Sequence, residues 1–377
     1  MSGDHALQIS AAAPVRPPVD TVLAAVARRQ EQGFDAVWWA DHLLHWFPPS
    51  IWTPDLAPMA AAQPSPHVWM DPFAMVAAAA GATDTIRLGV GVTDTVRRHP
   101  ASLAQTALTL DHVTRGRFIL GVGTGEELNL APLGMRNARP LARLDEALQV
   151  IRLLFSTPDE VDFEGEHVVL RGAAVGLRPY GDAPPPVWVA AHRPKGLALA
   201  GRLGDGWMPL ATDPGRYAEM LAVVEGAARE AGRAGAVTPG GYTRVVLAED
   251  DDTARTAAAR STLLRFIALT APSETFTAHG AVHPLGEGVF GLTRFRPTGL
   301  SRQEALRLAG AVPGEVVLDT VVAGTPATVA ARLAAIVRAG ARHLQVVNMT
   351  PLADPALAAA SESLLGEALT DLRAVAP

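Results

Sequence analysis

Short runs of β-branched and aromatic residues alternate along the chain with longer segments in which apolar residues recur at helical spacing. The short runs lie at residues 7–10, 35–40, 86–93, 117–122, 187–190, 206–210, 242–247 and 343–348. Such alternation predicts βα units and a parallel sheet. With eight strands it predicts an α/β fold, a single (β/α)8 TIM barrel spanning residues 1–377. An open, doubly wound sheet would give the same periodicity.

The segments between these strands predict helices at residues 18–32, 101–113, 140–155, 194–202, 214–231, 254–270 and 326–339. Proline stands where several of these helices begin, at Pro100, Pro140, Pro194, Pro214 and Pro326. The first helical turn tolerates proline because its N–H groups have no partner within the helix. The proline positions therefore support the same βα division.

Two segments, residues 45–73 and 271–300, interrupt the alternation. Both are rich in Pro or Gly and also carry aromatic residues. Loops of this length inside a compact domain are commonly functional or disordered, and their aromatic content favours order. We expect two long insertion loops at the carboxyl-terminal face of the barrel.

Composition narrows the possible partners. The net charge of −6 argues against nucleic-acid binding, and Lys195 is the only lysine. The absence of cysteine excludes disulfides and thiolate chemistry, and it is consistent with the cytoplasm. The first ten residues do not have the pattern of a signal peptide, and no apolar run is long enough to insert into a membrane.

Ionisable residues and glycines gather where the predicted strands end, which is where barrel enzymes place their chemistry. The first such end carries Asp41, His42 and Trp46. Histidine titrates near neutral pH and suits proton transfer, although a solvated strand end would look the same. His42 and Trp46 would share a face if a helical turn follows the strand.

Residues 121–129 read GVGTGEELN, a glycine-rich strand end that contains Glu126. Its spacing differs from both the dinucleotide-binding fingerprint and the phosphate-binding P-loop. Glycines allow a backbone to approach a flat ring closely, and Glu126 is placed to hydrogen-bond or protonate such a ring. A tight turn is the structural alternative.

Other kinds of site have weaker support. The chain has no H-E-x-x-H or G-x-S-x-G motif, and its one H-x-x-x-H pair, His279 and His283, has no evident third ligand. We therefore predict no metal. The basic segment His192-Arg193-Pro194-Lys195 opens a predicted helix and could bind an anion there.

In order and spacing, these motifs resemble the coenzyme F420-dependent branch of the luciferase-like monooxygenase superfamily. The resemblance runs almost the whole chain, through GFDAVWWADH at residues 33–42, RLGVGVT at 87–93 and GRFILGVGTGE at 116–126. It continues in VWVAA at 187–191, GDGW at 204–207 and GTP at 324–326. Within the branch the chain is similar to the F420-dependent glucose-6-phosphate and alcohol dehydrogenases and to the phthiodiolone ketoreductases.

The resemblance implies the positions of the ligands. The catalytic residues would be His42, Trp46 and Glu126, with a non-proline cis peptide at Gly91–Val92 behind the cofactor ring. The residues implied at the cofactor are Asp41, Gly91, Val92, Thr93, Asp94, Gly123, Thr124, Gly125, Glu126, Asn129, Ala190, Ala191, His192, Arg193, Pro194 and Lys195. The small-molecule substrate, expected to be bulky or apolar, would meet Trp46, Trp69, His283 and Phe290.

The implied reaction is hydride transfer between the deazaflavin and a carbonyl or alcohol carbon, in which His42 handles the proton on oxygen. The resemblance also implies a homodimer. Three alternatives stay open: an FMN-dependent monooxygenase, a methylene-tetrahydropterin-type reductase, and a barrel that binds F420 or a partner without catalysis.

Overall fold

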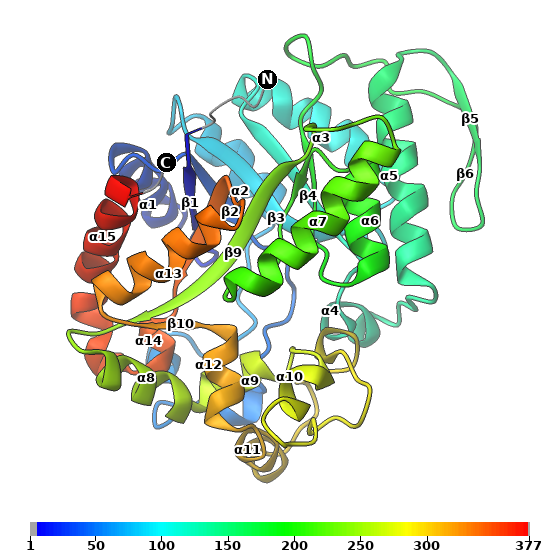
Figure 1. Cartoon of the computed structure of the whole chain (residues 1–377). Helices are drawn as coiled ribbons and strands as arrows, with labels where there is room; N and C mark the ends of the chain where they lie inside the picture. Colours follow the sequence, from blue (N-terminus) through cyan, green and yellow to red (C-terminus); the bar gives the residue numbers. More distant parts are fainter. Residues whose placement is uncertain (1–5, 376–377) are drawn as a thin grey trace.

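A closed parallel barrel forms the centre of the molecule in the computed structural model, which describes residues 6–375 (Figure 1). Its strands, in the order in which they pair, are β1 (Gln8–Ala12), β2 (Ala36–Trp39), β3 (Arg87–Asp94), β4 (Phe118–Gly123), β7 (Val187–Val189), β8 (Gly206–Trp207), β9 (Thr238–Leu247) and β11 (His343–Asn348). Because β11 pairs with β1, the ring closes. The predicted barrel is confirmed, and each predicted strand corresponds to one of these eight.

Three short strands were not predicted. Strand β10 (Val322–Gly324) lies outside the ring and pairs with the last residues of β9, whose earlier residues pair with β11. Strands β5 (Val161–Glu164) and β6 (Val169–Ala173) form an antiparallel hairpin beside α5, away from the barrel strands (Figure 1). The hairpin is largely exposed, so it gives only a weak apolar pattern.

Helices surround the barrel, and those that follow a strand and open on proline begin as predicted. The helices around the barrel are α1 (Val19–Glu31), α2 (Pro72–Ala80), α3 (Pro100–Thr114), α5 (Pro140–Ser156), α6 (Pro194–Leu203), α7 (Pro214–Glu230), α13 (Pro326–Arg338) and α15 (Ala358–Val375). Of these, α2 and α15 were not predicted. The single helix predicted over residues 254–270 is wrong. There the chain forms α8 (Asp251–Arg260) and α9 (Thr262–Ala268), because Ser261 adopts an extended conformation and caps α9 with its side chain.

Insertions beyond the strand ends build a second hydrophobic cluster, separate from the barrel-and-helix core. Helices α9, α10 (Ser273–Thr277), α11 (Arg302–Gly310) and α12 (Gly314–Thr320) gather at one side of the molecule in Figure 1. Residues from the 45–73 loop, including Phe47 and Ile51, are fully buried in the same cluster. The two insertions are therefore ordered and pack together.

Two tryptophans fill the barrel interior beneath the strand ends. The rings of Trp38 and Trp188 lie 5.3 Å apart and are almost completely buried. A Cβ added to Gly89 or Gly206 would come within 2.4 Å of these rings, so glycine is required at both strand positions. The interior is thus filled by side chains at this level, below the strand ends.

Among residues 6–375, no helix is both long and apolar enough to cross a membrane.

Candidate active site

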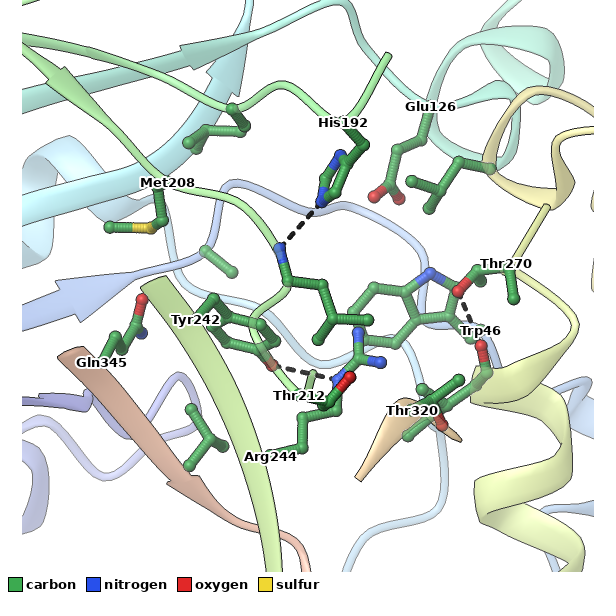
Figure 2. Close-up of a pocket in the computed structure, with 18 of the residues that line it drawn as sticks. Trp46, Glu126, His192, Met208, Thr212, Tyr242, Arg244, Thr270, Thr320 and Gln345 are labelled. Atoms are coloured by element: carbon green, nitrogen blue, oxygen red, sulfur yellow. Dashed lines mark hydrogen bonds between the residues drawn. The ribbon is translucent and has the colours of Figure 1, made fainter. Parts of the chain in front are cut away.

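A cavity of about 1060 Å³ opens above the Trp38 layer and is lined by residues from the ends of the barrel strands and from the insertions. Such a volume is at the upper end for small-molecule sites, so it can hold a large cofactor together with a substrate. Figure 2 shows Trp46, Glu126, His192 and Arg244 pointing into this space from different elements.

An ion-pair network joins the ends of β2 and β3 at the cavity wall. The hydroxyl of Thr93 donates to Asp41 Oδ2 at 2.6 Å. The guanidinium of Arg97 pairs with Asp41 at 3.2 Å and with Asp94 at 2.5 Å, and it donates to the Asp41 carbonyl. Both carboxylate side chains are only 4% exposed. Asp41 therefore serves to fix the strand ends against each other.

The Gly91–Val92 peptide bond is cis, as the resemblance implies. The β3–β4 register shifts between Val90 and Thr93, around this bond. The two methyl groups of Val92 lie close to Gly121 and Gly123 of β4, where a Cβ would come within 3.0 Å of them. Strand β3 therefore bulges at the cavity, with Gly91 and Val92 among its lining residues.

Asn129, on the short helix α4 (Glu127–Leu130), determines the tautomer of His42. Its Oδ1 accepts from the backbone N–H groups of Leu43 at 2.9 Å and Leu44 at 3.1 Å, which fixes the orientation of the amide. Its Nδ2 therefore faces His42 Nδ1 at 2.8 Å and donates to it. Nδ1 then carries no proton, so neutral His42 holds its proton on Nε2.

Two tryptophans fix the ring of His42. Trp69 stacks on it at 4.9 Å, and Trp46 contacts it edge-on at the same distance. No helical turn follows β2, so the condition under which His42 and Trp46 would share a helix face is not met, and a bend brings the rings together instead. His45, for which the sequence suggested no role, is buried and stacks on Phe47 and Trp69.

Glu126 is the acid nearest to His42, with its Oε2 atom 3.8 Å from Nδ1. Burial lowers the pKa of His42 and raises the pKa of Glu126. Each shift favours the uncharged form of its side chain. The pair can therefore hold one transferable proton without forming a full ion pair.

Other residues predicted at the cofactor divide into two groups. The cavity lining includes Gly123, Thr124, Gly125, Ala190, His192 and Arg193, but it does not include Ala191, Pro194 or Lys195. Lys195 is exposed in the first turn of α6.

His192 and Arg193 already have partners within the protein. His192 Nε2 accepts from the Leu210 N–H at 2.9 Å, and burial lowers the pKa of His192 to about 4. Arg193 is exposed and pairs with Glu274 at 3.0 Å. A neutral imidazole therefore occupies the cavity wall where a charged anion site was expected.

Of the residues predicted to meet substrate, Trp46, Trp69 and Phe290 line the cavity. His283 does not. It is buried in the 271–300 insertion, where its ring bonds to the backbone of Leu269 and Leu285.

Sequence reasoning missed Tyr242, Arg244 and Gln345, which also line the cavity. Tyr242 and Arg244 are two residues apart on β9, so they share one face of the strand. A charged residue inside the apolar segment RVVL was the available signal.

Comparison with known proteins gives a family match and two informative relatives. The luciferase-like monooxygenase family model matches residues 2–343. The chain is 34% identical to the phthiodiolone/phenolphthiodiolone dimycocerosates ketoreductase of Mycobacterium tuberculosis, over 90% of each chain. It is 36% identical to an F420-dependent glucose-6-phosphate dehydrogenase of Beutenbergia cavernae, over 55% of this chain and 58% of that one.

Solved structures share the fold at lower identity. An F420-dependent secondary alcohol dehydrogenase superposes with a TM-score of 0.74 at 23% identity, covering 97% of this chain and 99% of that one. The oxygenating constituent of 3,6-diketocamphane monooxygenase from Pseudomonas putida, solved with FMN, gives 0.65 at 17% identity over 99% of both chains.

Proposed function

The chain belongs to the luciferase-like monooxygenase family, and from this premise we propose that it is an oxidoreductase that exchanges a hydride between coenzyme F420 and a carbonyl or alcohol substrate. The observation that carries the proposal is the arrangement of His42, Asn129 and Glu126 in a cavity large enough for both molecules. The two relatives support the reaction type and the cofactor, respectively, since one is named a ketoreductase and the other F420-dependent.

The residues present fit a bound polar ring. Several cavity-lining side chains carry buried polar atoms that have no hydrogen-bond partner in the described protein: Trp46 Nε1, Trp69 Nε1, His45 Nδ1 and Glu126 Oε2. Buried polar groups are normally hydrogen-bonded, so such atoms indicate a ligand. We place the deazaflavin ring along Gly91–Val92 of β3, beside Thr124, Gly125 and Asn129.

When bound, the deazaflavin supplies or accepts the hydride at the substrate carbon. In the reducing direction, His42 donates a hydrogen bond from Nε2–H to the carbonyl oxygen and polarises it. Because Asn129 Nδ2–H occupies Nδ1, His42 keeps its own proton, and the proton that the oxygen gains comes from the neutral carboxyl group of Glu126, the acid nearest to His42. In the oxidising direction the proton returns by the same route.

The surrounding residues position these groups. Trp46 and Trp69 hold the imidazole and exclude water from its faces. Asn129 fixes the nitrogen that faces away from substrate. Arg97 keeps Asp41 and the strand ends in place. We expect such a site to accept a bulky or apolar carbonyl compound, because Trp46, Trp69 and Phe290 wall it.

A titration tests the cofactor. Tryptophans 38, 46 and 69 line the cavity, so quenching of tryptophan fluorescence reports on binding there. Titrating the apoprotein with F420 and with FMN should give saturable quenching by F420 and a much weaker response to FMN. Quenching by FMN alone would replace this proposal by an FMN-dependent monooxygenase.

A second assay tests the reaction. Reduced F420 is mixed with a panel of ketones, aldehydes and imines, and oxidised F420 with the corresponding alcohols, while deazaflavin absorbance is followed. Turnover with a carbonyl–alcohol pair supports the proposal. Turnover confined to a methylene-tetrahydropterin would move the chain to the pterin reductases.

We also propose that the enzyme is a cytoplasmic homodimer. Sedimentation equilibrium of the purified protein checks the oligomeric state, since a monomer has a mass of 39.5 kDa. Fractionation of the source cells checks the location.

A further inference from the structure

Arg244 is a buried cation that forms no ion pair among the described residues, although its charge partly offsets the rise that burial causes in the pKa of Glu126. Its residue is 9% exposed and lines the cavity. Its one side-chain hydrogen bond is a long one, from Nε to the hydroxyl of Tyr242 at 3.4 Å. The guanidinium also packs 5.2 Å from the centre of the Tyr242 ring, which orients it toward the cavity (Figure 2).

The other arginines that line the cavity are either paired with a carboxylate or exposed to water. Arg97 is paired with Asp41 and Asp94. Arg193 and Arg332 are exposed and paired, whereas Arg216 and Arg255 are exposed to water. Burying a charged group without a partner is costly, so the free protein keeps at Arg244 a site that an anion would satisfy.

The position of Arg244 separates it from the proposed cofactor ring. The barrel order runs β3, β4, β7, β8, β9 in one direction and β3, β2, β1, β11, β9 in the other. Strand β9 therefore stands opposite β3, where Gly91 and Val92 lie. Arg244 faces the ring across the cavity, on the side left for substrate.

The other residues that line this side of the cavity indicate what the rest of the ligand is like. Trp46, Met208, Leu210, Val347 and Met349 are apolar cavity residues. The Oε1 atom of Gln345, on the strand next to β9, is buried without a partner. Arg244 is the one buried arginine of the described cavity lining that has no ion pair, so a single positive charge is available, which matches a monoanion better than a dianion, and its planar fork matches a carboxylate.

We propose that Arg244 binds the carboxylate of the substrate, so that the enzyme acts on hydrophobic oxo acids and the corresponding hydroxy acids. This inference rests on the proposed function, because it assigns the cofactor to the β3 side. It adds an acidic group to the apolar substrate expected from the aromatic walls. Arg244 is then a specificity-determining residue, and His42 remains at the reacting oxygen.

Calorimetric binding tests the proposal without requiring turnover. The probes are aryl oxo acids of increasing chain length, beginning with 4-oxo-4-phenylbutanoate, each compared with its neutral methyl ester. They are titrated into the protein with and without bound F420. The variants are Arg244→Met, Arg244→Lys and, as control, Arg338→Met at an exposed arginine on α13.

Wild-type protein should bind at least one acid about ten-fold or more tightly than its ester. Arg244→Met should weaken the binding of that acid by about 10- to 100-fold, the effect of losing a charged hydrogen-bond partner. The binding of the ester should not change. Arg244→Lys should retain part of the preference, and Arg338→Met all of it. Thermal melting confirms that each variant is folded.

Two results would overturn the inference. One is equal binding of every acid and its ester by wild-type protein. The other is a loss of F420 affinity in Arg244→Met with no change in acid binding, which would assign Arg244 to the cofactor's acidic tail. A wild-type protein that binds the acid but not F420 would instead contradict the proposed function and leave the carboxylate site standing.

Discussion

At the scale of the residue, the chemistry depends on which nitrogen of His42 carries the proton. The amide of Asn129 is fixed by two backbone N–H groups, so it can only donate to Nδ1. His42 therefore presents an N–H to the cavity and acts first as a hydrogen-bond donor. The sequence predicted His42 and Asn129 as site residues, but it could not show that one sets the tautomer of the other.

Replacement of His42 tests its place in proton handling. His42→Ala should lower kcat by about 10²- to 10⁴-fold, the usual range for general acid–base help, because the substrate oxygen then loses its hydrogen-bond donor. F420 affinity should change little, and steady-state kinetics with a fluorescence titration separates the two effects. A kcat near that of the wild type would remove His42 from the mechanism.

Replacement of Asn129 tests its control of the tautomer. In Asn129→Asp the carboxylate can accept from Nδ1–H, so neutral His42 should move its proton from Nε2 to Nδ1, and the added negative charge should raise the pKa of His42. Nitrogen NMR of the imidazole reports both changes. Asn129→Ala, which adds no charge, should give a smaller rise. An unchanged tautomer in Asn129→Asp would show that Asn129 does not set it.

At the scale of the element, the site is built where β2 and β3 end. Arg97 holds two buried carboxylates, one from each strand end, and Arg98 lies 3.6 Å from the first of them. The sequence places Asp41 and Asp94 at strand ends, but their pairing with Arg97 depends on strand register. Register between distant segments cannot be read from one sequence.

Removal of Arg97 should show how much these strand ends depend on it. Arg97→Met leaves Asp41 and Asp94 buried together with only Arg98 nearby, and it should lower the free energy of unfolding by about 3–5 kcal/mol. Urea denaturation measures the change. Arg171→Met breaks the exposed Arg171–Glu164 pair on the hairpin and should cost at most about 1 kcal/mol. Equal losses in both variants would contradict a buried network.

The elements recovered from sequence are those with strong local signals. Apolar strands and helices that open on proline were predicted because their patterns are local. The break at Ser261 was missed because apolar residues flank it on both sides in helical spacing. Hairpin β5–β6 was missed because neither of its faces is fully buried.

At the scale of the whole molecule, closure of the barrel buries histidines as neutral groups. His343 is fully buried between Ser10, Gln8 and the two interior tryptophans. Burial lowers the pKa of His343 from 6.5 to about 3. His192 shifts in the same direction, to about 4.

Stability should therefore fall as the solution becomes acidic. Between pH 6.5 and 4.5 the unfolded chain binds protons at these histidines and the folded chain does not, so the free energy of unfolding rises with pH. His343 alone should contribute a slope of up to about 1.4 kcal/mol per pH unit. Urea midpoints across this range measure the slope, and His343→Gln should reduce it by that amount. A pH-independent stability would mean that these groups titrate normally in the folded state.

The position of Lys195 has a practical consequence for chemical labelling. It is the only lysine of the chain, it is exposed, and it stands two residues after the cavity-lining Arg193. Apart from the amino terminus, an amine-selective reagent meets no other primary amine. A dye attached there would report ligand entry by fluorescence transfer from the cavity tryptophans, without an engineered cysteine.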